Sequence, residues 1–212
     1  MTANNHIYIF QTPFGRVTAF RENGILKAKN IRYAYSERFN KPIAVQPSLG
    51  EIMFPEKTPA CPQNISPLLE KMIGKINLDN FEVDESPQFI SVFRPENCAK
   101  NENLSVIVWI HGGSYEIGCG DIPTADPTDW VKEQNVIVVT VSYRLGIFGF
   151  LGGNEKKPAN LGLFDLIEAL KWIKNNIASF GGNPENITLF GQSSGGDLIA
   201  HLLLSEGIEN LF

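Results

Sequence analysis

Three short apolar runs that alternate with expected helices constrain the fold of this chain most strongly. The runs are Ser105–Ile110, Val136–Val141 and Ile187–Phe190. Strands that are apolar on both faces and alternate with helices are typical of a parallel sheet covered on both sides. We therefore expect an α/β fold with a mixed, mostly parallel sheet and helices on both of its faces.

The beginning of the chain makes that sheet mixed. Asn23-Gly24 separates the apolar stretches Val17–Phe20 and Ile25–Ala28, and Asn-Gly between such stretches predicts a tight β-hairpin, because both residues tolerate positive φ. Further strands are expected at Ile7–Phe10, Arg16–Arg21 and Gln88–Phe93, and helices near Pro67–Ile76, at Pro127–Gln134, over Leu163–Ile177 and over Leu198–Leu204. We see no linker that would divide residues 1–212, which predicts that they belong to a single domain.

Composition narrows the class of protein. With 43% hydrophobic and 19% charged residues, the 212-residue chain is typical of globular proteins. Its formal net charge of −5 argues against an extended nucleic-acid or anionic-membrane surface. The apolar runs are too short to span a bilayer, and the first residues do not resemble a signal peptide. We therefore expect a cytoplasmic protein whose Cys61, Cys98 and Cys119 are reduced thiols.

A Gly-x-Ser-x-Gly motif, Gly191-Gln192-Ser193-Ser194-Gly195, lies between the third apolar run and the last expected helix. Such a motif alone is weak evidence, but a strand before it and a helix after it are the context of a nucleophile elbow. So sharp a turn holds the central serine in a strained conformation and brings backbone close to the flanking glycines. An ordinary Gly/Ser-rich turn is the less favoured reading.

A second motif, His111-Gly112-Gly113-Ser114, directly follows the first apolar run. Acyl transfer builds negative charge on the substrate oxygen, and backbone N–H groups in a loop of small residues can stabilise that charge. The N–H of Ser194, at the start of a helix, would be a further donor. An ordinary glycine turn after a strand is the alternative for this motif taken alone.

Together these motifs resemble the type-B carboxylesterase family of the α/β-hydrolase fold. The stretch Phe180–Gly195 fits the long serine signature of that family at every fixed position. Four further stretches match in order, and the earlier chain extends the match: these are Val108–Gly113, Ser142–Gly146, Phe148–Leu151 and Asn160–Leu163 with Asp165, preceded by Arg38-Phe39, Cys61–Gln63 and Pro95. The resemblance therefore covers nearly the whole chain.

The resemblance implies a function and a set of site residues. Ser193 would be the nucleophile that forms an acyl-enzyme with a small-molecule ester, and the amides of Gly113, Ser114 and Ser194 would form the oxyanion hole. Two internal ion pairs with structural roles, Arg38–Glu85 and Arg144–Asp165, are implied as well. The resemblance implies no cofactor and no metal.

Several positions depart from the family pattern. Ser114 replaces a glycine of the oxyanion loop, and Gln192 replaces the acidic residue that usually precedes the nucleophile. Pro87 stands where the usual disulfide partner of Cys61 would be, which fits a reducing compartment. Residues 61–85 contain no tryptophan, so choline esters are not the expected substrates.

The catalytic base is the main missing feature. A nucleophile of this fold needs an acid and then a histidine later in the chain. His201 lies eight residues along the helix that follows Ser193, about 12 Å of helical rise away, and neither His6 nor His111 fits the role. We therefore expect the acid and base beyond Phe212, in a missing C-terminal half that would also act as a partner, and a 212-residue chain that is inactive alone.

Other functions remain open at this stage. A non-catalytic fragment or binding scaffold of the same fold would explain the missing histidine, whereas the intact motif at Ser193 favours an enzyme. A serine peptidase or acyltransferase of the same fold is a third alternative, with no further motif in its favour. A chain of this kind is also expected to leave Ile187–Phe190 at an open sheet edge and to associate with other molecules.

Overall fold

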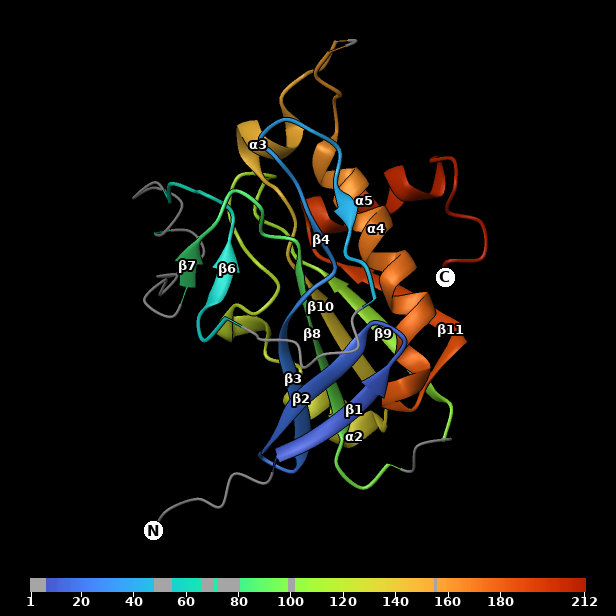
Figure 1. Cartoon of the computed structure of the whole chain (residues 1–212). Coiled ribbons are helices and arrows are strands. Elements are labelled where there is room, and N and C mark those ends of the chain that lie inside the picture. The colour runs from blue at the N-terminus through green and yellow to red at the C-terminus, as the bar shows by residue number, and fades with distance from the viewer. Residues whose placement is uncertain (1–6, 48–54, 66–70, 72–80, 99–101, 155) are drawn as a thin grey trace.

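A seven-stranded mixed sheet forms the centre of the molecule in the computed structural model, which describes residues 7–47, 55–65, 71, 81–98, 102–154 and 156–212 (Figure 1). From one edge to the other its strands are β1 (Ile7–Thr12), β2 (Gly15–Glu22), β3 (Ile25–Arg32), β8 (Phe89–Pro95), β10 (Ile137–Val141), β9 (Leu104–Ile110) and β11 (Gly182–Gly191). Two small sheets flank it, formed by β4 (Ala34–Tyr35) with β5 (Ile43–Ala44) and by β6 (Thr58–Ala60) with β7 (Phe81–Val83). The strands expected from the sequence are thus all present in the central sheet.

The hairpin expected at Asn23-Gly24 joins β2 to β3. Asn23 has φ 52° and Gly24 φ 81°, and Glu22 pairs with Ile25 across the turn. Two successive residues of positive φ match the twist of the flanking strands, as in a type I′ turn. This part of the prediction is confirmed.

The three apolar runs form parallel neighbours, since β9 pairs in parallel with both β10 and β11. The expected predominance of parallel pairing does not extend to the rest of the described sheet: β1–β2, β2–β3, β3–β8 and β8–β10 are all antiparallel. Residues Phe89–Arg94 of β8 are buried on both faces although both neighbours are antiparallel. A central strand can therefore be buried on both faces whatever its direction, and periodicity alone does not give the direction.

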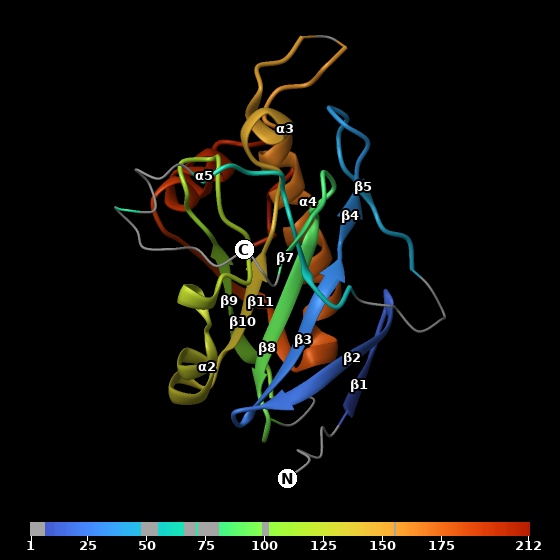
Figure 2. The same ribbon diagram turned by 90° about the vertical axis from the view of Figure 1, so that its left-hand side faces the viewer.

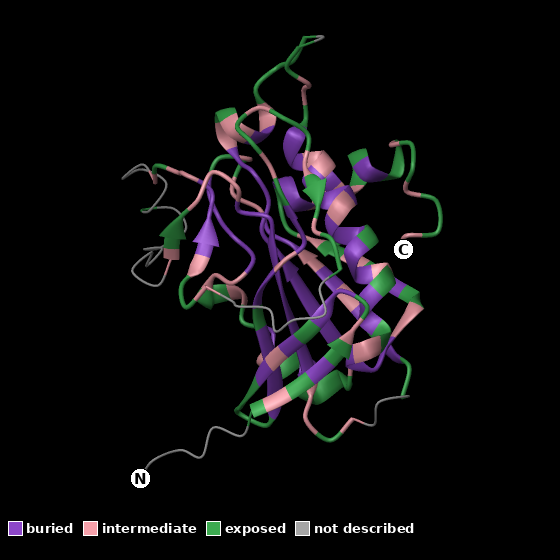
Figure 3. Cartoon of the chain, viewed as in Figure 1, coloured by how far each residue is buried: buried purple, intermediate pink, exposed green. Residues whose placement is uncertain are grey.

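Helices lie on both faces of the sheet, as Figure 2 shows. The larger layer consists of α4 (Leu161–Asn176), a following 3₁₀ turn (Ile177–Phe180) and α5 (Ser194–Leu203), and it packs on Val106, Val108 and Val139. On the opposite face α2 (Thr128–Gln134) packs through Val131, near a short 3₁₀ turn (Pro123–Ala125). The buried residues are concentrated between the sheet and the α4–α5 layer (Figure 3).

Two further elements differ from expectation. A short helix, α3 (Gly146–Phe150), lies just after β10 in a segment that carries two glycines and was not predicted to be helical. The helix expected near Pro67–Ile76 falls, apart from Lys71, outside the described residues. Across the part of the chain that is described, no helix has the length and apolar character needed to cross a membrane.

Candidate active site

The turn between β11 and α5 has the geometry expected of a nucleophile elbow. Ser193 has φ 55° and ψ −125°, a conformation that L-residues rarely adopt, and α5 begins at the next residue. The turn is held by hydrogen bonds from the amide of Gly195 to the carbonyl of Gln192, at 2.9 Å, and from the amide of Asp197 to the carbonyl of Ser193, at 3.1 Å. The side chain of Ser193 is exposed.

Glycines on either side of Ser193 allow the close backbone packing that this turn requires. A Cβ at Gly191 would lie 2.5 Å from the carbonyl carbon of Gly195, and a Cβ at Gly195 would lie 2.1 Å from the carbonyl oxygen of Ile110. Neither contact is tolerable for any other residue. The predicted reason for the two glycines of the motif is confirmed.

The loop after β9 lies directly against this turn, because β9 and β11 are parallel neighbours and end at the same edge of the sheet. A Cβ at Gly112 would lie 2.5 Å from the carbonyl oxygen of Gln192 and 3.1 Å from the Cβ of Ser193. Gly113, Ser114 and Tyr115 then have φ values of 116°, 56° and 65°. The structure thus brings together the two motifs that the sequence separates by about eighty residues.

Three backbone amides at this junction have no hydrogen-bond acceptor among the described residues. Within the described part of the chain, the backbone N–H groups of Gly113, Ser114 and Ser194 donate no hydrogen bond. Ser194 is the first residue of the ten-residue helix α5, so its amide also carries the positive end of the helix dipole. The carbonyl oxygen of Gly113, by contrast, already accepts hydrogen bonds from the amides of Glu116 and Ile117, both at 3.0 Å.

His111 lies buried at the base of the loop. Its ring stacks on Tyr143 with centroids 4.5 Å apart, and its Nδ1 lies 2.8 Å from the carbonyl oxygen of Gly112. Burial lowers the pKa of His111 to about 4, so the ring is neutral at physiological pH. The hydroxyl of Tyr143 also donates to the carbonyl of His111, at 2.7 Å. His111 therefore supports the loop from inside the fold.

His201, the other histidine among the described residues, does not reach Ser193 either. His201 is exposed on α5, with Nε2 3.6 Å from Oδ2 of Asp197. No hydrogen bond joins it to Ser193 in the described structure. His6 falls outside the described residues. The expectation that His201 is a solvated helix residue agrees with this geometry.

Gln63 is a residue of this region whose role was missed by reasoning from the sequence. Its side-chain amide forms two hydrogen bonds with Gly118, donating to the carbonyl at 3.0 Å and accepting from the N–H at 2.8 Å. Gln63 thereby fixes the segment that follows the loop. In the sequence the stretch Cys61–Gln63 matches the family pattern, but nothing local indicates a partner 55 positions away.

Both expected ion pairs are present. Arg144 and Asp165 form a buried pair, with side chains 1% and 0% exposed, and Arg38 and Glu85 form an exposed one. Hydrogen bonding to Arg38 lowers the pKa of Glu85. The two pairs link segments around the site and do not contact Ser193.

The cysteines, all of which lie in the described residues, are not joined by disulfides. The Sγ of Cys61 is buried and accepts the amide of Leu145 at 3.2 Å. Burial raises the pKa of the Cys61 thiol to about 11, and raises that of Cys119 further still. Both are therefore protonated, unreactive thiols at neutral pH.

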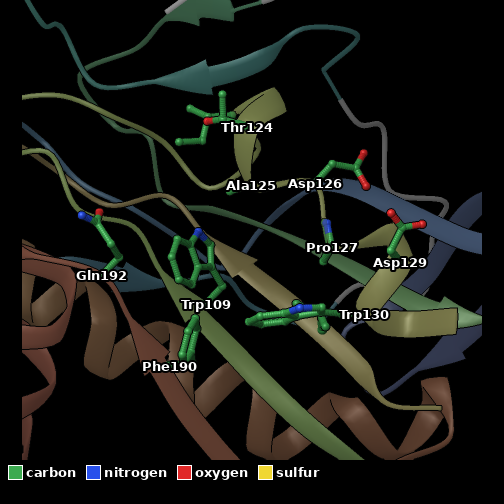
Figure 4. Close-up of a pocket in the computed structure, with 11 residues that line it drawn as sticks. Trp109, Thr124, Ala125, Asp126, Pro127, Asp129, Trp130, Phe190 and Gln192 are labelled. Atoms are coloured by element: carbon green, nitrogen blue, oxygen red, sulfur yellow. The ribbon is translucent and has the colours of Figure 1, made fainter. Parts of the chain in front are cut away.

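A cavity of about 530 Å³ borders the turn on the face of the sheet that carries α2 (Figure 4). Phe190 lies between Trp109 and Trp130, with ring centroids 5.3 and 5.1 Å from theirs. Gln192 lines the end nearest Ser193, and Asp126 and Asp129 line the other part. The cavity therefore combines apolar surface with Gln192, the residue that directly precedes the serine. No cluster of side chains suited to a metal ion occurs among the described residues.

Comparison with known proteins agrees with this geometry. The model of the carboxylesterase family matches residues 8–212. The para-nitrobenzyl esterase of Bacillus subtilis (strain 168) is 38% identical over 219 residues, which cover 96% of this chain and 42% of that protein. Carboxylesterase 1D of Rattus norvegicus is 35% identical over 207 residues, 85% of this chain and 36% of its own length.

Solved structures give the same result. A structure described as a thermophilic PNB esterase superposes with a TM-score of 0.82 at 37% identity, covering 96% of this chain and 42% of that one. A second PNB esterase structure has a TM-score of 0.79 at 38% identity. The chain spans about two fifths of the length of these relatives. With the fold, the turn at Ser193 and the adjoining loop as described, the chain belongs to the carboxylesterase family.

Proposed function

We propose that this chain is the nucleophile-bearing part of a serine esterase that hydrolyses small-molecule carboxylic esters. The observation that carries the proposal is a strained, exposed Ser193 beside a loop and a helix start whose three backbone amides have no acceptor in the described chain. A merely structural turn has no need of this combination, because strain and unpaired donors both cost stability.

In the proposed reaction, Oγ of Ser193 bonds to the carbonyl carbon of the ester while its proton passes to a general base. The amides of Gly113, Ser114 and Ser194 stabilise the negative charge on the former carbonyl oxygen. The alcohol leaves with a proton, an acyl-enzyme forms at Ser193, and water then releases the acid and restores the hydroxyl.

The base and its acid, in this proposal, come from the part of the family fold that the chain does not span. The support is that His111 is buried and neutral and that His201 pairs with Asp197. The relatives, more than twice as long, leave room for both groups. Residues 1–212 would then be the N-terminal portion of one α/β-hydrolase domain, and the remaining portion would be their partner.

Two features bear on substrate and compartment. Residues 61–85 lack tryptophan, which argues for esters without a quaternary ammonium group. Cys61 is a buried thiol, and this supports a reducing, cytoplasmic setting.

The second candidate is a binding scaffold of the same fold without catalysis. It is favoured by one observation, that no described histidine is hydrogen-bonded to Ser193. The two candidates differ in whether Ser193 becomes reactive when the rest of the fold is supplied.

A chimera tests this directly. Residues 1–212 are joined to the part of the Bacillus subtilis para-nitrobenzyl esterase that follows the aligned region, and the product is treated with a fluorophosphonate probe. We expect labelling at Ser193 and hydrolysis of p-nitrophenyl acetate, both lost in Ser193→Ala and retained in the matched control Ser205→Ala.

Two results would change the proposal. A folded chimera that takes no label, with its circular dichroism spectrum intact, would favour the scaffold. Stoichiometric labelling of Ser193 in residues 1–212 alone would show that a local group acts as base, and the assignment of the base to another segment would be wrong.

A further inference from the structure

The loop beside Ser193 has positive φ at three successive residues. Gly113, Ser114 and Tyr115 all have positive φ, and two of them carry side chains. L-residues enter this region at a cost and remain there only where surrounding contacts hold them. Two of the proposed oxyanion amides belong to this segment, so their position depends on those contacts.

Tyr115 supplies most of the contacts. Its N–H donates to Oγ of Ser194 at 3.3 Å, and its carbonyl accepts the N–H of Gly146 at 2.6 Å. Its ring packs edge-on against Phe150 with centroids 4.9 Å apart. Finally, its hydroxyl donates to Oδ2 of Asp197. Backbone, ring and hydroxyl are thus all held, by α3 on one side and α5 on the other.

Asp197 connects the same loop to the serine turn. Its amide donates to the carbonyl of Ser193 at 3.1 Å, while its carboxylate accepts the hydroxyl of Tyr115. One residue therefore contacts both the segment with the proposed nucleophile and the segment with the proposed oxyanion donors. Burial and the hydrogen bond to Asp197 raise the pKa of Tyr115 to about 12, so the phenol remains a donor at neutral pH.

We infer that Tyr115 and Asp197 are positioning residues, whose hydroxyl–carboxylate bond holds the loop Gly113–Tyr115 in its strained conformation against the turn at Ser193. The inference rests on the proposed function for its chemical meaning, because it concerns the proposed oxyanion amides. The bond itself is a property of residues 1–212 and can be tested without any reaction.

Hydrogen exchange of the loop amides is the test. The amides of Glu116 and Ile117 donate to the carbonyl of Gly113, so their exchange reports opening of the loop. In Tyr115→Phe, which removes one oxygen, and in Asp197→Ala, we expect their exchange to be about five-fold faster. The double variant should be no faster than either single variant, because both remove the same bond.

Two further variants separate this role from general stability. Asp197→Asn keeps an oxygen that accepts from Tyr115 and should restore slow exchange, and Ser205→Ala, whose hydroxyl donates to the carbonyl of His201, should leave exchange unchanged. Amides of β10 should be unaffected in every variant. Unchanged loop exchange in Tyr115→Phe, or equal acceleration in β10, would overturn the inference. If Asp197→Ala does not fold, Tyr115→Phe still decides.

Failure of this inference and failure of the proposed function give different results. Unchanged exchange together with labelling of Ser193 in the chimera would support the esterase function and refute the positioning role of Tyr115 and Asp197. Faster exchange in the variants with no labelling of the chimera would support the role of the Tyr115–Asp197 bond and refute the esterase function.

Discussion

Arg144 and Asp165 meet at two points inside the fold: Nη2 lies 2.7 Å from Oδ1 and Nε lies 2.8 Å from Oδ2. The carboxylate also accepts the backbone amide of Arg144 at 3.0 Å and the side-chain amide of Gln88 at 3.2 Å. The pair thereby ties the end of β10 to α4 and to the start of β8. Because both charges are fully buried, each depends on the other.

Asp165→Asn should therefore be strongly destabilising. It leaves the guanidinium of Arg144 buried without a counter-charge, and we expect the free energy of unfolding to fall by about 3–5 kcal/mol. Urea denaturation followed by circular dichroism measures the loss. Glu85→Gln, in the exposed pair with Arg38, is the matched control and should have little effect; equal losses in both variants would contradict the argument from burial.

Gly195 and Gly196 provide a second matched comparison. A Cβ at Gly195 would meet the carbonyl oxygen of Ile110 at 2.1 Å, whereas one at Gly196 meets its nearest neighbour at 3.4 Å. Gly195→Ala should cost about 3 kcal/mol or more through backbone displacement, while Gly196→Ala, inside α5, should stabilise by about 0.5–1 kcal/mol. Melting temperatures of the two variants against the parent chain would show the opposite signs.

The neutral, buried His111 predicts a loss of stability in acid. Its folded pKa of about 4 lies below its ordinary value of 6.5, so the unfolded chain takes up the proton first. The contribution of this group is present above pH 6.5 and is lost as the pH falls through 4, by about 3 kcal/mol. Unfolding free energies from pH 7 to pH 4 should decline less steeply in His111→Asn than in His201→Asn, and parallel curves would contradict the assignment.

The thiols should differ in reactivity between the folded and unfolded chain. Denatured protein under non-reducing conditions should contain three thiols, and a count of one would reveal a disulfide. In the folded chain Cys61, with a pKa of about 11, should react slowly with Ellman's reagent at neutral pH. In the unfolded chain the pKa of this thiol is near its ordinary value of 9.0. Ionisation of Cys61 should therefore lower the free energy of unfolding progressively as the pH rises from 9 to 11.

The edge strand β11 should make residues 1–212 self-associate. Among the described strands β11 pairs with β9 alone, and Phe190 is 43% exposed. Open backbone groups next to apolar side chains favour edge-to-edge pairing. Thr188→Lys should shift the chain towards monomer in gel filtration with light scattering. Gln11→Lys, on the opposite edge strand β1, is the control; an equal shift there would mean that β11 is not the contact.

Much of the scaffold follows from local patterns in the sequence. The hairpin at Asn23-Gly24, the strands Ser105–Ile110 and Val136–Val141, and the turn at Ser193 depend on neighbouring residues, and those patterns are legible without a structure. The segment Gly146–Phe150 was missed because its two glycines disfavour a helix that packing against α4 nevertheless stabilises.

The contacts that complete the site were not predictable in this way. The bonds of Gln63 to Gly118 and of Tyr115 to Asp197 join positions 55 and 82 residues apart. Neither contact is signalled by a periodicity or a turn motif in the sequence. Each exists only because the fold brings loops that are distant in the sequence together at one end of the strands. The antiparallel direction of β8 was hidden for a related reason, since burial on both faces hides strand direction.

The register between β9 and β11 also determines which changes of chain length the site can tolerate. Val106 pairs with Ile187, and the pairing continues in step until Ile110 faces Gly191. The strands β9 and β11 therefore end at the same level of the sheet. Deleting one residue from Ile187–Phe190 would retract Ser193 by about 3.3 Å relative to the loop and reverse the face of every strand side chain between the deletion and Ser193. Insertions between Gly152 and Ala159 lie outside both strands, so they change neither the position of Ser193 relative to the loop nor the register of the two strands. Natural variation in length should therefore accumulate in the outer loops and be absent from these two strands.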